Sequence, residues 1–157
     1  MSPDLKRRLL TATTGGAVAI AAVLVQWHEG IRHKPYKDGG YVLTVCYGHT
    51  GEEVILAKRY TDEECLALLD SDLKAAMAVV ETQVTVPLTE MQKAALASFV
   101  YNVGSGAFAR STLLKKLNAG DMPGACNEMR RWKYDEGKVS KGLINRRAVE
   151  RELCLPD

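Results

Sequence analysis

The sequence predicts a single α+β domain that is mainly helical. Its 157 residues suit one domain with its own core. Most of the chain places apolar residues at helical spacing behind helix-start signals, and only 41–47 is rich in β-branched and aromatic residues, as strands are. With 46% hydrophobic and 25% charged residues the composition is that of a globular protein. A net charge of +2 is too small to indicate nucleic acid, and we expect none as a partner.

The first element is an uncharged, helix-compatible run from Leu9 to Trp27, preceded by Lys6, Arg7 and Arg8. The run is just long enough to span a bilayer. The run also contains threonines and glycines, so it has few strongly apolar residues. Those residues supply only about −2 to −4 kcal/mol of insertion free energy. A membrane would therefore hold it weakly. A cleaved signal peptide, a stable anchor and a buried core helix of a cytosolic enzyme are the alternatives.

The stretch that follows carries the candidate chemistry. Glu29 stands at the end of the apolar run, and Gly30 is a helix-stop signal. Asp38 opens a predicted hairpin turn, 38–40, and Thr44 lies in the predicted strand 41–47. Two carboxylates in different environments can cleave a glycosidic bond, one as acid and one activating water. The alternative is that Glu29 is a solvated helix end and Asp38 an ordinary turn residue.

Helices follow in the rest of the chain. A short strand or loop is expected over 52–59. Thr61 and Glu64 form a capping box that starts a helix to about Glu81. Its apolar stripe predicts buried positions at Leu66, Leu69, Leu73, Ala76, Met77 and Val80. Thr89 and Gln92 open a second helix, apolar nearly all round and therefore central.

Three further helices are expected at 111–118, near 122–132 and at 143–154, the last two separated by 135–137. Gly120 stops the first of them. Arginines gather in this region, and we expect them on solvated faces or against carboxylates of a ligand: Arg130, Arg131, Arg146 and Arg147.

The four cysteines allow three pairings. They would be disulfides in an exported protein and thiols or metal ligands in a cytosolic one. Cys46, His49 and Cys65 lack a fourth ligand at zinc-site spacing, so we expect no metal. Cys46 on the hairpin is near Cys65 on the next helix, while Cys126 and Cys154 fall on C-terminal helices. The predicted pairs are therefore Cys46–Cys65 and Cys126–Cys154.

Several motifs resemble the signature of phage-type lysozymes, glycoside hydrolase family 24. They are Glu-Gly at 29–30, Tyr-Lys-Asp at 36–38 and Thr-Val-Cys-Tyr-Gly-His-Thr-Gly at 44–51. Glu29, Asp38 and Thr44 fall on the catalytic residues of that family. Cys46 departs from it, because many members carry glycine there. The resemblance implies a lysozyme-like two-lobe fold, with a small β-hairpin lobe, a long connecting helix and a helical C-terminal lobe. It also implies a buried ion pair between His49 and Asp72.

The implied activity is that of an endo-β-1,4-N-acetylmuramidase acting on the glycan strands of peptidoglycan. Glu29 would be the general acid, while Asp38 and Thr44 would position the attacking water, with inversion at the anomeric carbon. Tyr36 and Asn102 are candidate substrate contacts. No cofactor is expected, and we expect a monomer.

Residues 1–28 also resemble the signal-anchor-release segment of a subgroup of phage endolysins, leaving 29–157 as the catalytic domain. Such a segment enters the host inner membrane uncleaved, here through residues 9–27, and later leaves it. The enzyme would then act in the host periplasm during lysis. The alternatives are a cytosolic lysozyme released by a separate holin, a non-catalytic membrane-tethered wall-binding protein, and a lytic transglycosylase.

Overall fold

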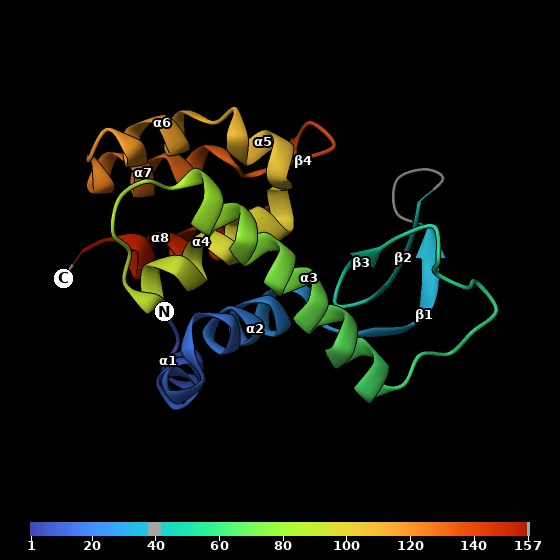
Figure 1. Ribbon diagram of the computed structural model, residues 1–157. Coiled ribbons are helices and arrows are strands. Elements are labelled where there is room, and N and C mark those ends of the chain that lie inside the picture. Colours follow the sequence, from blue (N-terminus) through green and yellow to red (C-terminus); the bar gives the residue numbers. More distant parts are fainter. Residues whose placement is uncertain (38–41, 157) are drawn as a thin grey trace.

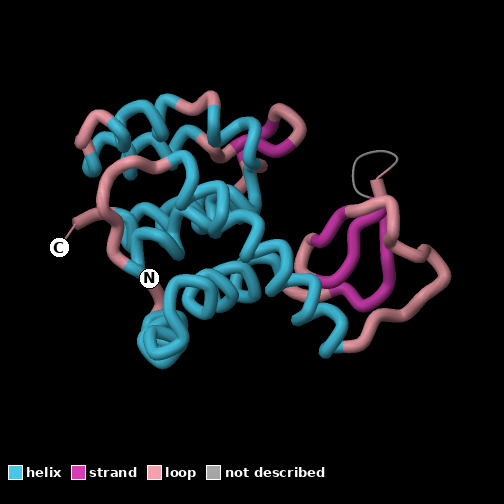
Figure 2. The backbone as a smooth tube through the Cα atoms, viewed as in Figure 1, coloured by secondary structure: helices cyan, strands magenta, loops and turns pink. Residues whose placement is uncertain are grey.

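The chain folds into two lobes of unequal size joined by one long helix (Figure 1). The computed structural model describes residues 1–37 and 42–156. The smaller lobe holds a three-stranded antiparallel sheet, and the larger lobe is helical (Figure 2). Helix α3, Asp62–Gln83, begins under the sheet and ends in the helical lobe. The α+β, mainly helical, two-lobe fold expected from the sequence is confirmed.

The N-terminal apolar run is not one helix. Helix α1, Pro3–Ala12, is separated from α2, Gly16–Glu29, by a 3₁₀ turn over Thr13–Gly15. Gly16 has φ of +78°, a conformation that glycine adopts without steric cost, and threonine is a weak helix former. Because the chain turns at this point, α1 packs across one end of α2 instead of extending its axis (Figure 1).

Residues before Glu29 belong to the same core as the rest of the helical lobe. Helix α4, Glu90–Val103, lies at its centre and packs against α2, α3 and α8. The side chains that the N-terminal segment buries there include Leu5, Leu9, Ile20, Leu24 and Val25. By length and composition alone, Pro3–Glu29 is the one helical run in the described part of the chain that could also cross a membrane.

The sheet consists of β1, Arg32–Lys37, β2, Leu43–Cys46, and β3, His49–Thr50, in that order. Strand β2 is shorter than the predicted 41–47, and the predicted turn 38–40 lies outside the described residues. In the register, Tyr36 faces Thr44 and Val45 faces His49. The segment between β3 and α3 has no regular element, so 52–59 is a loop.

Both predicted disulfides, Cys46–Cys65 and Cys126–Cys154, are formed. Cys46 has φ of +63°, in the left-handed region that favours glycine. Glycine would adopt this conformation without steric cost. Here a cysteine adopts it and links the sheet to the first turns of α3.

The predicted capping box of Thr61 with Glu64 is present, and Thr89 and Gln92, which were predicted to open the next helix, form a second one. One predicted core position is wrong. Leu66 is 47% exposed, because the first turns of α3 extend beyond the helical lobe toward the sheet. The stripe is buried only from Leu69 onward.

The C-terminal part contains more elements than predicted. A short helix α5, Ser105–Ala109, precedes α6, Thr112–Asn118, and α7, Met122–Glu128, runs into a 3₁₀ turn over Met129–Arg131. Then β4, Tyr134–Asp135, and β5, Lys138–Val139, form a hairpin before α8, Lys141–Cys154. Glu136 and Gly137, at its two-residue turn, both have positive φ, as in the tight turns of β-hairpins.

Candidate active site

Glu29 is the last residue of α2, and Gly30, with φ of +66°, ends the helix there. Its carboxylate lies between the two lobes. Arg146 Nη1, from the helical lobe, donates to Glu29 Oε1 at 2.6 Å. On the other side, a Cβ at Gly48 would lie 3.2 Å from Glu29 Oε2. Glycine at position 48 therefore allows the turn after β2 to approach the carboxylate closely.

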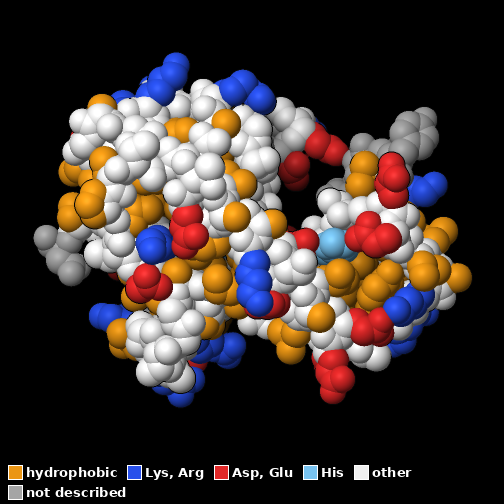
Figure 3. Space-filling view, in the orientation of Figure 1, with side chains coloured by type: hydrophobic (Ala, Val, Ile, Leu, Met, Phe, Trp, Pro, Cys, Tyr) orange, Lys and Arg blue, Asp and Glu red, His pale blue; other side chains and the backbone are white. Residues whose placement is uncertain are grey.

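Glu29 lines a cavity of about 560 Å³. The space-filling view shows the surface hollowed between the lobes (Figure 3). The rest of the lining is mixed: it includes aromatic, basic and amide side chains, the carboxylate of Asp135, and the apolar side chains of Val103 and Leu143. Aromatic rings and amides suit a sugar, whose faces are apolar and whose rim is polar. The principal lining residues are Asn102, Arg131, Trp132, Tyr134 and Arg146.

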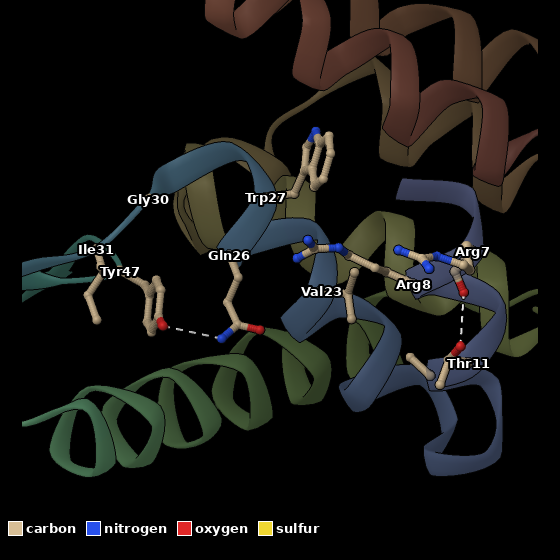
Figure 4. Close-up of a pocket in the computed structure, with 10 residues that line it drawn as sticks. Arg7, Arg8, Thr11, Val23, Gln26, Trp27, Gly30, Ile31 and Tyr47 are labelled. Atoms are coloured by element: carbon tan, nitrogen blue, oxygen red, sulfur yellow. Dashed lines mark hydrogen bonds between the residues drawn. The ribbon is translucent and has the colours of Figure 1, made fainter. Parts of the chain in front are cut away.

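A larger cavity, about 730 Å³, lies between α1, α2 and Tyr47 (Figure 4). The Arg8 guanidinium stands 5.5 Å from the centroid of the Trp27 ring in one wall. Gln26 Nε2 donates to Tyr47 Oη at 3.3 Å in the opposite wall. No carboxylate lines this cavity among the described residues. The larger cavity therefore offers no acid for glycosidic bond cleavage, whereas the smaller cavity is lined by Glu29.

The positions of Arg146 and Arg147 differ from those expected from the sequence. Arg146 and Arg147 were expected on a solvated face, yet they are 3% and 1% exposed. Only Arg130 and Arg131 are exposed as expected. The two buried arginines are neutralised by Glu29 and by Glu150, which is fully buried on the same helix. One signal in the sequence could have indicated this burial. Glu150 follows Arg146 by four residues and Arg147 by three, which is the spacing of ion pairs within a helix.

Thr44 is 3% exposed in β2. Its hydroxyl is buried and has no hydrogen-bond partner in the described parts of the chain. A buried hydroxyl without a partner is costly, so such a group is commonly kept to bind something. Tyr36 faces Thr44 across the sheet, and the Arg32 guanidinium lies 4.6 Å from the centroid of the Tyr36 ring. Asp38, the second predicted carboxylate, lies outside the described residues.

Two contacts fix the small lobe against the helices. Tyr101 Oη donates to the backbone oxygen of Tyr47 at 2.6 Å, and burial raises the pKa of this phenol, so it stays a donor. His49 Nδ1 lies 2.7 Å from Asp72 Oδ2, as expected, and His49 Nε2 lies 2.6 Å from Glu53. The His49–Asp72 pair is less buried than expected, because the Asp72 side chain is 31% exposed.

His28 and Asn102 complete the wall around Glu29. Burial, with Arg146 and Arg147 nearby, lowers the pKa of His28 to about 4, so this ring is neutral at ordinary pH. Arg147 Nη1 donates to Asn102 Oδ1 at 2.9 Å. Asn102 is thus held in place at the cavity, and the predicted contact with an N-acetyl group remains a prediction.

Together, the two-lobe fold, the cleft between the lobes and a helix-end glutamate at its edge define a lysozyme-type glycoside hydrolase. The chain belongs to the phage lysozyme family, whose model matches residues 26–150. A SAR-endolysin of bacteriophage PS119 is 50% identical over 99% of this chain and 96% of its own. The function is thus that of a phage lysozyme, and peptidoglycan is the substrate of lysozymes.

Solved structures agree with this assignment. A mutant of P22 lysozyme superposes with a TM-score of 0.75 and is 32% identical, covering 87% of this chain and 95% of its own. The structure of the active form of the P1 phage endolysin Lyz has a TM-score of 0.75 at 22% identity, covering 98% of this chain and 93% of its own. The second similarity concerns the fold alone, and it extends over the N-terminal segment.

Proposed function

We propose that the protein is an endolysin that hydrolyses the β-1,4 bond between N-acetylmuramic acid and N-acetylglucosamine. The observation that carries this proposal is the position of Glu29. Its carboxyl group lines the cavity and is held there by a 2.6 Å ion pair with Arg146. Trp132 and Tyr134 give the cavity aromatic surfaces for a glycan strand.

In the proposed reaction, protonated Glu29 donates its proton to the glycosidic oxygen as the bond from the anomeric carbon to that oxygen breaks. A water molecule attacks the anomeric carbon from the opposite face, which inverts its configuration. Asp38 accepts the proton that the water loses. The Thr44 hydroxyl, buried and without a partner in the described residues, orients this water. The role of Asp38 rests on its place in the motif.

The same proposal includes activation by release of residues 1–28 from the host inner membrane. In the docked arrangement, Leu24 and Val25 of α2 are fully buried in the core, and the same helix delivers Glu29 to the cavity. While residues 9–27 lie in lipid, Glu29 is held at the membrane surface and this helix cannot pack on α4. The two disulfides support action in the periplasm, because such bonds persist outside the cytoplasm.

Purified protein and purified peptidoglycan test the chemistry. Glu29→Gln keeps the shape of the side chain but cannot donate the proton, so turnover should fall by about 10²–10⁴-fold. Glu52→Gln, an exposed loop residue, is the matched control. New reducing ends at N-acetylmuramic acid, released first as the α-anomer in NMR spectra, are the expected product. Equal lysis by Glu29→Gln and wild type would end the catalytic proposal, and anhydro sugars would indicate a lytic transglycosylase.

Cell fractionation tests the release step. Protein made in a bacterial host should sediment with membranes at first and move to the soluble periplasmic fraction when the membrane is depolarised, with lysis following. A cytosolic lysozyme that depends on a holin would instead be soluble throughout and would carry free thiols. Intact mass with and without reductant distinguishes the two.

A further inference from the structure

Glu150 is a buried carboxylate that does not line the cavity. It lies on α8 with no exposed surface, four residues after Arg146. A buried carboxylate is costly unless it is paired and hydrogen-bonded. Replacing a buried ion pair with apolar residues is often neutral or stabilising, so stability alone is a weak explanation for Glu150.

The contacts of Glu150 fix the orientation of Arg146. Ser98 Oγ donates to Glu150 Oε2 at 2.6 Å, and Arg146 Nε donates to the same oxygen at 3.3 Å. Arg146 Nη2 in turn donates to the backbone oxygen of Ser98 at 3.1 Å. With two edges of the planar guanidinium held in this way, Nη1 is the group left to reach Glu29, at 2.6 Å.

Glu150 also balances the charge around Glu29. Arg147 Nε lies 2.7 Å from Glu150 Oε1, so the two buried arginines face two carboxylates, Glu29 and Glu150. With all four groups ionised the cluster is neutral. When Glu29 takes up the proton that it must donate, the cluster carries one positive charge. Without Glu150 it would carry two, and the protonated form would be harder to reach.

We propose that Glu150 is a positioning residue for the general acid, acting through Arg146. It holds the guanidinium in the orientation that fixes the Glu29 carboxyl group, and its charge allows Glu29 to carry a proton beside two arginines. This inference rests on the proposed role of Glu29. The charged or titratable groups that face Glu29 in the described residues are Arg146 and Arg147 of α8, Tyr101 of α4, His28 of α2, and Arg131 and Asp135 across the cavity.

The pH dependence of kcat/KM on solubilised peptidoglycan tests the inference. The fall of kcat/KM at high pH reports loss of the proton from the acid. Glu150→Gln keeps the size of the side chain but removes its charge, so this fall should move to lower pH by about one unit. At neutral pH kcat should drop about tenfold, because a misplaced acid reacts slowly. KM should stay within about twofold, because Glu150 does not touch the substrate.

Arg147→Met gives the opposite charge change in the same cluster. It leaves Glu29 and Glu150 opposite Arg146 alone, so the high-pH fall should move to higher pH. A purely structural defect would not shift the profile in opposite directions in the two variants. Glu152→Gln is the matched control, since it removes an exposed charge from the same helix and should leave the profile unchanged.

Circular dichroism establishes which variants are folded. If Glu150→Gln folds and has the wild-type profile, the inference is wrong. If Glu150→Gln does not fold, Arg147→Met decides: a shift to higher pH supports the inference, and no shift or a shift to lower pH overturns it. Glu29→Gln, measured in parallel, separates the two proposals, because full activity in that variant would remove the role of Glu29 itself.

Discussion

Glu90 Oε2, on the first turn of α4, accepts a hydrogen bond from the backbone N–H of Ala17 at 2.9 Å. Ala17 lies in the first turn of α2, whose own N-cap residue, Gly15, provides no side-chain hydrogen bond. A residue 73 positions away in the sequence therefore caps this helix. The carboxylate also lies at the positive end of the α2 dipole. Because the cap requires the break at Thr13–Gly15, it is specific to the docked N-terminal segment.

Glu90→Ala should destabilise the docked state. Loss of the cap is expected to cost about 0.5–2 kcal/mol of unfolding free energy. Glu90→Gln should cost less, because the amide oxygen can still accept the hydrogen bond. Urea denaturation of the soluble protein measures both, with Glu52→Gln as the control. An unchanged midpoint for Glu90→Ala would show that the cap contributes nothing.

Gly16→Leu should keep more of the protein in the membrane fraction. Position 16 has φ of +78° in the docked state, where a leucine side chain is strained by about 1–3 kcal/mol. The substitution also makes the segment more apolar, which favours lipid. Thr14→Leu is the control, since it adds apolar surface at a position whose backbone is not in the left-handed region. Membrane fractionation and the time of lysis measure the effect.

Full wall-cleaving activity from a Gly15→Leu, Gly16→Leu protein that stays in the membrane would show that release is not the activation step.

His49 should make stability depend on pH. Burial lowers the pKa of His49, but its hydrogen bonds with Asp72 and Glu53 outweigh burial, so the pKa lies above the usual 6.5. Because the folded pKa exceeds the unfolded one, the charged histidine stabilises the fold fully below about pH 6.5. This contribution disappears as the pH rises through the folded pKa. The difference in unfolding free energy between wild type and His49→Gln should therefore be larger at pH 5 than at pH 9. A constant difference would contradict the assignment.

The two disulfides should not be equally important. Their sequence separations of 19 and 28 residues give about 3–4 kcal/mol each in the chain-entropy model. Cys46, however, has φ of +63°, which costs a non-glycine residue about 1–2 kcal/mol. Cys46→Gly with Cys65→Ala should recover part of that cost and lose less stability than Cys126→Ala with Cys154→Ala. Thermal unfolding of both double variants decides, and the reverse order would show that the left-handed backbone at Cys46 carries no such cost.

Thr44→Val should distinguish the contribution of the hydroxyl to activity from the contribution of side-chain shape to packing. Valine fills the same buried space, so the fold should keep its stability or gain some, since a buried hydroxyl without a partner is removed. If this hydroxyl orients the water, turnover should fall by about 10²-fold. Thr44→Ser should retain most of the activity. Valine and serine variants of equal activity would exclude the water-holding role.

The sequence predicted what depends on local signals. The capping boxes at Thr61 and Thr89 and the stop at Gly30 mark helix ends, and all three ends are where expected. Motif spacing, read as a family resemblance, predicted the lobes and the catalytic candidates. Cysteine positions on neighbouring elements were enough to pair the disulfides.

What the sequence missed depends on contacts between distant residues. Periodicity cannot distinguish a solvated arginine from one that tertiary structure buries against Glu29, so the environment of Arg146 was not predicted. The break at Thr13–Gly15 was missed because an uncharged run reads as one helix. The β4–β5 hairpin was missed because its two strands have two residues each, too few for an alternating pattern.

In the proposed release mechanism, one set of side chains in the first 29 residues has to suit the lipid bilayer first and the protein core afterwards. The face that packs on α4 is buried as tightly as any part of the core, whereas Thr11, Thr13 and Thr14 face outward. Leucine at those outward positions would favour lipid without improving the packing, and charge there would favour water without harming it. We therefore expect that adding charge at these outward positions alone shifts the protein from lipid to water and leaves the helix that ends in Glu29 unchanged.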